Sequence, residues 1–180
     1  MRTLDIRRHT MRRKPGQHLS REGIALARLV AESNPAYDLV VASTIPRAVE
    51  TAIAMGLEVD RCIEELGRLP DPVFDELGWP SPFARVAGAV AANGPAARFA
   101  AEQAGLWQEV AAQVPDGGRA LIVTHGLFVE LGAVASLPDA DHAGWGEAIG
   151  YCEGVRLVYD ENGCRGDLLR LPDAQRLIEN

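Results

Sequence analysis

The composition of this 180-residue chain excludes several classes of protein. Hydrophobic residues make up 47% and charged residues 24% of the sequence, which is typical of a soluble globular protein and not of a disordered one. The formal net charge of −7 argues against general nucleic-acid binding, and no apolar run reaches the length of a membrane span. The length fits one domain, residues 1–180, with a substantial core.

Cysteine usage and the first residues of the chain indicate a cytoplasmic protein. The three cysteines, at positions 62, 152 and 164, are too few and too scattered for a disulfide framework or a zinc site. The sequence is charged from Arg2 onward and does not resemble a secretion signal. We therefore expect a protein of the reducing cytoplasm that needs no metal and no cofactor.

The first half of the chain predicts strands that alternate with helices. Alternation of apolar and polar residues predicts a short strand around residues 4–6. Ser20 is a suitable N-cap for a helix extending to Ser33, whose apolar residues recur at helical spacing. The apolar run at residues 38–43 predicts a buried strand, and Pro46 suits the first turn of the helix that follows.

The second half continues the alternation and ends in a hairpin. Residues 57–63 predict a weaker strand, and the four prolines within residues 64–83 exclude a long helix there. Asn162-Gly163 is typical of a tight turn between two antiparallel strands. The remaining helices are expected at residues 83–92, 96–114 and 127–135, and the remaining strands at residues 119–124, 154–159 and 164–171.

This order of elements predicts an α/β fold. We expect a three-layer sandwich with a mostly parallel central sheet, helices on both faces and an antiparallel edge from the C-terminal hairpin. Ligands bind such sheets beyond the carboxyl ends of the strands. His9, His125 and the segment from Ser43 to Arg47 each follow a predicted strand. We therefore expect them to meet in one crevice.

Histidine and arginine at these strand ends suit the chemistry of phosphoryl groups. Eight of the first 28 residues are arginine or lysine although the chain is acidic, which indicates a small anionic ligand. Two arginines can neutralise phosphate oxygens in a forked geometry, and they favour the neutral, nucleophilic form of an imidazole. A neutral imidazole can attack phosphorus and leave a phosphohistidine for water to cleave.

Four short motifs occur in order along the chain. Together they resemble the motifs of the histidine phosphatase family, the phosphoglycerate-mutase-like superfamily, over nearly the whole sequence. The motifs are Arg8-His9, with Thr10 where the family has glycine; Leu19-Ser20-Arg21-Glu22-Gly23; the segment from Ser43 through Arg47-Ala48 to Thr51-Ala52; and Val123-Thr124-His125-Gly126. Each motif alone is weak, but their order and their positions at strand and helix junctions make the resemblance specific.

The resemblance implies a role for each of these side chains. His9 is the nucleophile that becomes phosphorylated, and Arg8 and Arg47 bind the phosphoryl oxygens. His125 donates a hydrogen bond to the phosphoryl group and stabilises the transition state.

Two positions depart from the family pattern. The hydroxyl of Thr10 either adds a hydrogen-bond donor for the substrate, or the side chain narrows the pocket. The family often has a glutamate that protonates the leaving group, and Glu76 is its nearest match here. Asp75 and Asp71 are alternatives, and some small members of the family lack this acid and act on substrates with good leaving groups.

A basic loop follows the proposed nucleophile. Arg12, Arg13 and Lys14 either bind a second phosphate or carboxylate of the substrate, with Arg13 as our candidate, or form a solvated surface. The expected partner is a small phosphorylated substrate or a phosphoprotein, with no nucleic acid and no membrane. The oligomeric state is left open.

The favoured function is a phosphatase that works through phosphohistidine. A phosphoglycerate-mutase-type phosphotransferase is the first alternative, but it must exclude water, and the chain offers little sequence for a lid. A non-catalytic member that binds phosphorylated ligands is the second. A metallohydrolase is the third, although the chain has no compact metal-ligand motif.

Overall fold

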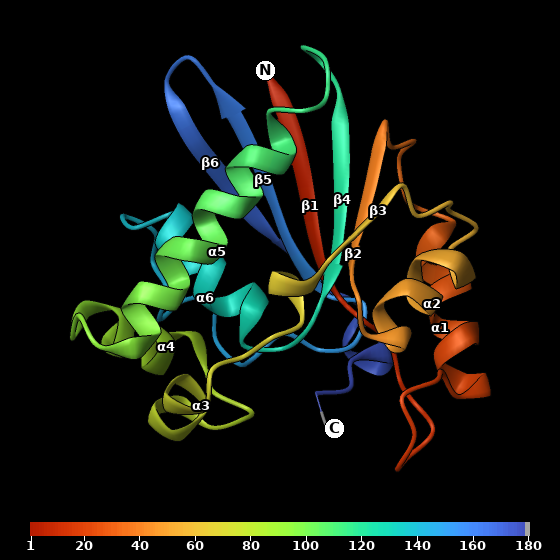
Figure 1. Cartoon of the computed structure of the whole chain (residues 1–180), viewed down its shortest axis with the longest axis horizontal. Helices are drawn as coiled ribbons and strands as arrows, with labels where there is room; N and C mark the ends of the chain where they lie inside the picture. The colour runs from red at the N-terminus through yellow and green to blue at the C-terminus, as the bar shows by residue number, and fades with distance from the viewer. Residues whose placement is uncertain (179–180) are drawn as a thin grey trace.

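A mixed six-stranded sheet forms the centre of the computed structural model, which describes residues 1–178 (Figure 1). Its strands are β1 (Arg2–Arg8), β2 (Leu39–Ser43), β3 (Arg61–Ile63), β4 (Arg119–Thr124), β5 (Gly154–Asp160) and β6 (Gly163–Leu169), in the order β3-β2-β4-β1-β5-β6. The first four strands pair in parallel, whereas β5 is antiparallel to β1 and β6. The predicted mostly parallel sheet with a hairpin edge is confirmed.

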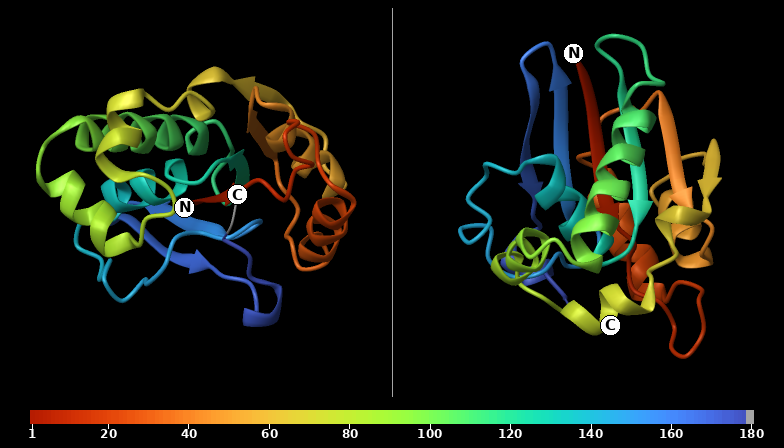
Figure 2. Two further views of the ribbon diagram at one scale, coloured as in Figure 1. Left: turned by 90° about the horizontal axis from the view of Figure 1, so that it is seen from below. Right: turned by 60° about the vertical axis from the view of Figure 1, so that its left-hand side comes forward.

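Helices cover both faces of this sheet (Figure 2). They are α1 (Arg21–Ala31), α2 (Pro46–Ala54), α3 (Asp71–Leu77), α4 (Phe83–Ala91), α5 (Pro95–Ala111) and α6 (Phe128–Ser136), with the 3-10 turns η1 (Glu64–Leu66) and η2 (Asp173–Gln175). Alternate residues of β4 face different cores because side chains alternate along a strand. Ala120 and Ile122 pack with apolar residues of α3 to α6, while Leu121 and Val123 pack with those of α2. The predicted three-layer sandwich is therefore confirmed.

Local sequence signals explain where the first helices begin. The Ser20 hydroxyl accepts a hydrogen bond from Gly23 N at 3.0 Å and caps α1. A Cβ atom on Gly23 would lie 2.2 Å from the Met11 carbonyl oxygen, so this close approach requires glycine. Pro46 stands in the first turn of α2, where its missing N–H costs no hydrogen bond.

The segment before α4 is more ordered than the sequence predicts. The four prolines at residues 64–83 exclude a long helix, yet η1 and the seven-residue helix α3 form there. Pro72 lies in the first turn of α3, which tolerates proline, and Gly78 ends the helix with φ of 68°. The strand expected at residues 57–63 is shorter and covers only β3.

Candidate active site

Two neighbouring strand ends bring the histidines of the predicted site together. His9 directly follows β1 and His125 directly follows β4, and these parallel strands place Arg8 opposite Thr124. The backbone N–H of His9 donates to the Thr124 carbonyl at 2.8 Å, and the two imidazole centroids lie 5.1 Å apart. The structure thus places both rings in one site, at the carboxyl edge of the sheet.

Arg47 reaches the same site from the first turn of α2. Its Nε atom donates a hydrogen bond to His9 Nε2 at 3.0 Å, and its Nη1 atom donates to Gln17 Oε1. Thr51, one turn further along α2, donates its hydroxyl to the Arg47 carbonyl at 2.6 Å. The arginine is half-buried, so a guanidinium charge stands directly beside the imidazole of His9.

The hydrogen bonds of His9 define which ring nitrogen carries the hydrogen. Its Nδ1 atom lies 2.6 Å from the Thr10 carbonyl oxygen, which can only accept, so Nδ1 carries the hydrogen. The Nε2 atom therefore holds a lone pair, and Arg47 donates to it. Burial, followed by the nearby His125 and Arg8, lowers the pKa of His9 well below its usual value. The ring is neutral at physiological pH.

His125 is held by Ser43 at the end of β2. The Ser43 hydroxyl lies 2.7 Å from His125 Nε2 and also accepts a hydrogen bond from Ile45 N at 3.3 Å. A Ser43 hydroxyl that donates to Nε2 leaves the ring hydrogen of His125 on Nδ1, the buried ring nitrogen that has no hydrogen-bond partner among residues 1–178. Burial, then the charges of Arg47 and Arg8, lowers the pKa of His125 to about 3.

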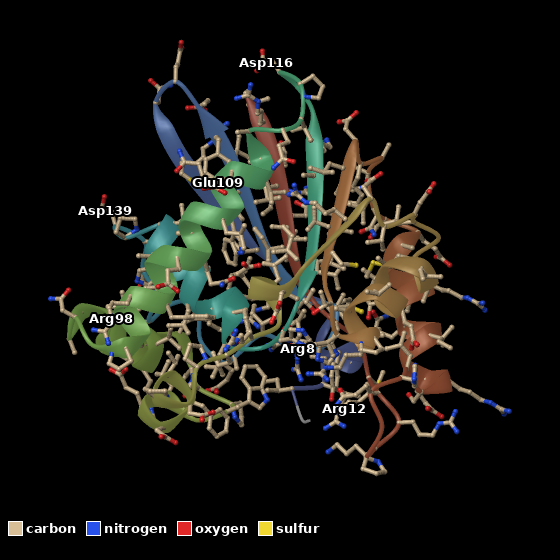
Figure 3. The ribbon with its side chains drawn as sticks, viewed as in Figure 1. Arg8, Arg12, Arg98, Glu109, Asp116 and Asp139 are labelled. Atoms are coloured by element: carbon tan, nitrogen blue, oxygen red, sulfur yellow. The ribbon has the colours of Figure 1, made fainter. Side chains whose placement is uncertain are left out.

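Arg8 is fixed on its faces and on one edge. Its guanidinium carbon lies 4.7 Å from the ring centroid of Trp79 and 4.1 Å from that of Tyr151. Its Nη1 atom donates to the carbonyl oxygens of Ile149 and Ile178, at 3.0 and 2.9 Å. Figure 3 shows Arg8 near the carboxyl ends of the strands.

A cavity of about 180 Å³ opens onto these cations and histidines. The other side chains around it are apolar or aromatic, and no carboxylate belongs to the lining within residues 1–178. The lining consists of Arg8, His9, Arg47, Gly67, Leu69, Phe74, Trp79, His125, Gly126, Leu127 and Phe128. The volume suits a phosphoryl group, with the remainder of a ligand emerging past the apolar rim.

The turn after His125 is tightly packed against Trp79. A Cβ atom on Gly126 would lie 2.3 Å from the Trp79 ring, so glycine is required where the indole crosses this turn. Leu127 follows with φ of 66°, a conformation that residues with a side chain rarely adopt. Such strain is often found at functional sites, and here it reverses the chain directly after the histidine.

The structure does not bring the predicted acids to the cavity. The Oε2 atom of Glu76 accepts a hydrogen bond from Ala96 N at 2.9 Å, so the carboxylate satisfies the first turn of α5. Asp71 and Asp75 are exposed on α3, and neither lines the cavity. Spacing along the sequence could not reveal this, because α3 directs Glu76 toward α5.

Thr10 and Arg13 also lie outside the lining. The Thr10 hydroxyl donates to the Gly23 carbonyl at 3.0 Å, and its backbone N–H donates to Thr51 Oγ1 at 3.0 Å. These bonds direct the side chain toward α1 rather than into the cavity. Arg13 is exposed on the basic loop, where its backbone N–H donates to the His18 carbonyl.

Several aromatic residues of the site were not identified from the sequence. Phe74 on α3 and Trp79 after it line the cavity, whereas Tyr151, in the loop before β5, stacks on Arg8 outside the lining. No periodic pattern marks these residues. An aromatic residue within a long proline-containing segment is the one signal that could have indicated Trp79.

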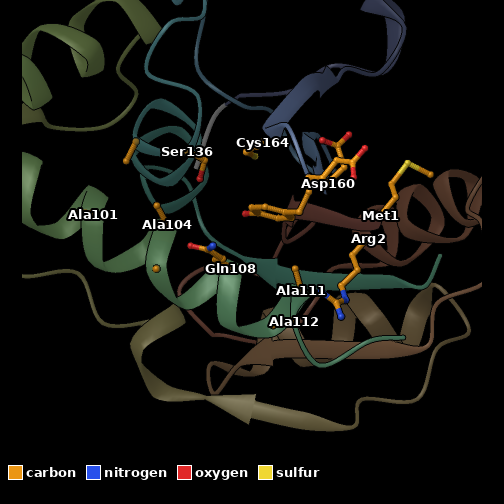
Figure 4. A pocket seen from close by; sticks show the side chains of 15 residues that line it. Met1, Arg2, Ala101, Ala104, Gln108, Ala111, Ala112, Ser136, Asp160 and Cys164 are labelled. Carbon is orange, nitrogen blue, oxygen red and sulfur yellow. The ribbon is translucent and has the colours of Figure 1, made fainter. Parts of the chain in front are cut away.

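A larger cavity, of about 780 Å³, lies at the other end of the sheet (Figure 4). It is lined by the start of β1, by α5 and by the turn between β5 and β6, and it contains none of the predicted site residues. Within residues 1–178 there is no group of three or more histidine, cysteine, aspartate or glutamate side chains that could hold a metal ion.

Comparison with known proteins shows the fold. No protein-family model and no curated protein sequence matches the chain. A solved structure of phosphoserine phosphatase from Entamoeba histolytica with 3-phosphoglyceric acid has a TM-score of 0.69 and 16% identity, over 95% of this chain and 98% of that chain. YhfR from Bacillus stearothermophilus has a TM-score of 0.64 and 18% identity, over 92% and 95%. A mycobacterial glucosyl-3-phosphoglycerate phosphatase with inorganic phosphate has a TM-score of 0.58 and 24% identity, over 93% and 95%. The chain has the phosphoglycerate-mutase-like fold that the motifs imply.

Proposed function

We propose that this chain is a phosphohydrolase of the histidine phosphatase family that works through a phosphohistidine on His9. One observation carries the proposal: the lone pair on His9 Nε2 lies in a small cavity beside Arg8, Arg47 and His125. The solved phosphatases of the same fold, with bound 3-phosphoglyceric acid or phosphate, support it.

The first step is nucleophilic attack by His9. The phosphoryl oxygens bind to Arg8 and Arg47, and Arg47 turns from Nε2 to the incoming anion. A bond forms between Nε2 and phosphorus as the bond from phosphorus to the leaving oxygen breaks, and the leaving group takes the electron pair of that bond. The Nδ1–H group of His9 keeps its hydrogen bond to the Thr10 carbonyl, and this carbonyl stabilises the positive charge that the ring acquires.

His125 and water complete the reaction. The Nδ1–H group of His125 donates to a phosphoryl oxygen and stabilises the charge that develops in the transition state. The oxygen of a water molecule then bonds to phosphorus as the bond between nitrogen and phosphorus breaks. One proton of the water passes to solvent, and inorganic phosphate is released. The lone pair returns to Nε2, so the enzyme regains its starting state.

The absence of a carboxylate from the described lining limits the leaving group. An alkoxide needs a proton as it leaves, and Glu76 is engaged with α5. We therefore infer that good substrates have leaving groups stable without protonation, such as aryl phosphates and acyl phosphates. The aromatic rim formed by Phe74 and Trp79 suits an aryl group, and a phosphorylated protein side chain of this class also meets the requirement.

The basic loop contributes to substrate choice in this proposal. Arg12 is held by the carbonyls of Pro15 and Gly16, at 3.2 and 3.0 Å, and its charge helps to lower the pKa of Arg47 after the larger effect of burial. The loop therefore adds positive charge near the phosphate-binding side chains. We propose that Arg13 binds a second anionic group on the substrate from this loop.

The test is hydrolysis of p-nitrophenyl phosphate by the wild type and by His9→Ala. We expect turnover that survives a chelator and disappears in His9→Ala. Phosphate binding without turnover of any phosphoester would instead support a binding protein, and isomerised ester in place of inorganic phosphate would support a mutase. Activity that a chelator abolishes would support a metallohydrolase.

We also propose that the protein acts in the cytoplasm. The three cysteines are unpaired, which supports the reducing cytoplasm as the location of this activity. No helix within residues 1–178 has both the length and the apolar character needed to cross a bilayer.

A further inference from the structure

The segment at residues 171–178 lies against the phosphate-binding end of the sheet (Figure 1). It follows β6 and contains the turn η2. We propose that this segment belongs to the phosphate-binding apparatus because it orients Arg8, and that Glu153 is the positioning residue that fastens it. The inference rests on the proposed function, since it assigns Arg8 to the phosphoryl group.

Two backbone carbonyls hold one nitrogen of Arg8. Nη1 carries two hydrogens, and the carbonyls of Ile149 and Ile178 accept them at 3.0 and 2.9 Å. The segment also fixes the aromatic ring beneath the guanidinium, because Tyr151 N donates to the Leu177 carbonyl at 2.9 Å. The plane of the guanidinium is therefore set partly by residues 177 and 178.

Glu153 fastens both chain segments that supply these carbonyls. Its side chain is fully buried, and each carboxylate oxygen accepts two hydrogen bonds. Oε2 accepts from Gly150 N and Arg170 Nη1, both at 2.8 Å, which holds the segment that contains Ile149. Oε1 accepts from Leu171 N and Arg176 Nε, at 2.9 and 2.8 Å, which holds the segment that ends at Ile178.

Arg8 and Glu153 are also joined through the backbone. Arg8 N donates to the Glu153 carbonyl at 2.8 Å, and Cys152 N donates to the Arg8 carbonyl at 3.1 Å. Arg170 strengthens the same assembly by donating to the carbonyls of Trp145, Glu147 and Ala148. One buried carboxylate thus links β5, the loop before it and the last described segment to the guanidinium that receives phosphate.

The arrangement predicts an effect on phosphate affinity more than on the chemical step. A bidentate contact between arginine and phosphate requires the guanidinium in a fixed plane, whereas attack by His9 depends on Arg47 and His125. Loss of the Ile178 carbonyl removes one of the two carbonyls that hold Nη1, so the guanidinium of Arg8 is oriented less firmly before each binding event. The dissociation constant of phosphate should then rise about tenfold.

The experiment compares the wild type with a chain that ends at Leu171 and with the point variant Arg176→Ala. We expect the dissociation constant of inorganic phosphate, measured by calorimetry, and the KM for p-nitrophenyl phosphate to rise about tenfold on truncation. In Arg176→Ala both should rise in the same direction but less, with a smaller change in kcat. Arg176→Lys should restore part of the affinity, because it keeps the charge beside Glu153.

Arg165→Ala is the matched control. It removes an arginine that pairs with Asp160 beside the turn between β5 and β6, away from the site, and should leave phosphate affinity unchanged. The inference is overturned if the wild type binds phosphate and turns over substrate while both test variants match it. It is equally overturned if truncation increases turnover. A wild type that neither binds phosphate nor hydrolyses the ester would overturn the proposed function as well.

Discussion

Acid should destabilise this protein through His9 and His125. Both rings are buried and neutral, and the pKa of His125 falls from the usual 6.5 to about 3, chiefly through burial. The unfolded chain binds protons at these histidines below pH 6.5, whereas the folded chain does not. Their contribution to stability is therefore complete above pH 6.5 and is lost as the pH falls toward the folded-state pKa.

The size of this loss of stability follows from the number of pH units below 6.5, the pKa of histidine in the unfolded chain. Each pH unit below 6.5 costs about 1.4 kcal/mol at His125, so at pH 5 this ring lowers the free energy of unfolding by about 2 kcal/mol, and His9 acts in the same direction. Glu130 acts in the opposite direction, because burial raises its pKa to about 7 and its protonation stabilises the folded chain as the pH falls. A titration of the wild type alone would therefore mix two opposing effects.

The assay is urea denaturation of the wild type and of His125→Asn at pH 7 and at pH 5. Replacement of the ring removes one titratable group and leaves Glu130 in place. The loss of unfolding free energy between the two pH values should be about 2 kcal/mol smaller in the variant than in the wild type. Equal losses in both proteins would show that His125 is already protonated in the folded state, and would refute the reasoning.

Three further predictions concern single side chains. In Glu130→Gln the amide can still accept from Ile149 N, so the variant should gain about 3 kcal/mol of stability over the wild type between pH 5 and pH 9, measured by denaturation; a difference independent of pH would contradict this. Ser43→Ala removes the partner of His125 Nε2 and should lower kcat/KM about tenfold. Thr44 is the exposed neighbour of Ser43, and Thr44→Ala should leave kcat/KM unchanged. Equal effects of the two substitutions would exclude a role for Ser43 in orienting the ring. Glu76→Gln should leave kcat for p-nitrophenyl phosphate within about twofold and cost about 1 kcal/mol of stability, as expected for a group that satisfies a helix N-terminus; a hundredfold loss of kcat would restore it as the proton donor.

Sequence periodicity was sufficient for the sheet and for the centre of the site. Strand residues alternate between two cores, and buried strands end where polar residues begin, so the positions of His9 and His125 followed from local patterns. The segment that contains Arg47 was placed near them because Pro46 marks the first turn of α2. The rule that parallel strands end at the same edge of a sheet was sufficient for this placement, whereas the roles of Arg8 and Arg47 came from the resemblance to the histidine phosphatase family.

Contacts made by loops and helix ends were not accessible in this way. Glu76 is a residue type that can act as a general acid, but the direction of its side chain depends on how α3 packs on α5. Thr10 replaces a glycine, yet only the fold shows that its hydroxyl bonds to the Gly23 carbonyl. The support of Arg8 by Ile178 joins residues 170 positions apart, and no local pattern encodes such a contact.

The most direct test of the proposed mechanism is rapid quenching of the protein with a radiolabelled aryl phosphate, followed by mapping of the labelled peptide. The mechanism predicts transient label on Nε2 of His9, formed and lost at rates consistent with turnover. It also predicts no label in His9→Ala. Hydrolysis that continues at the wild-type rate while His9 stays unmodified would contradict it.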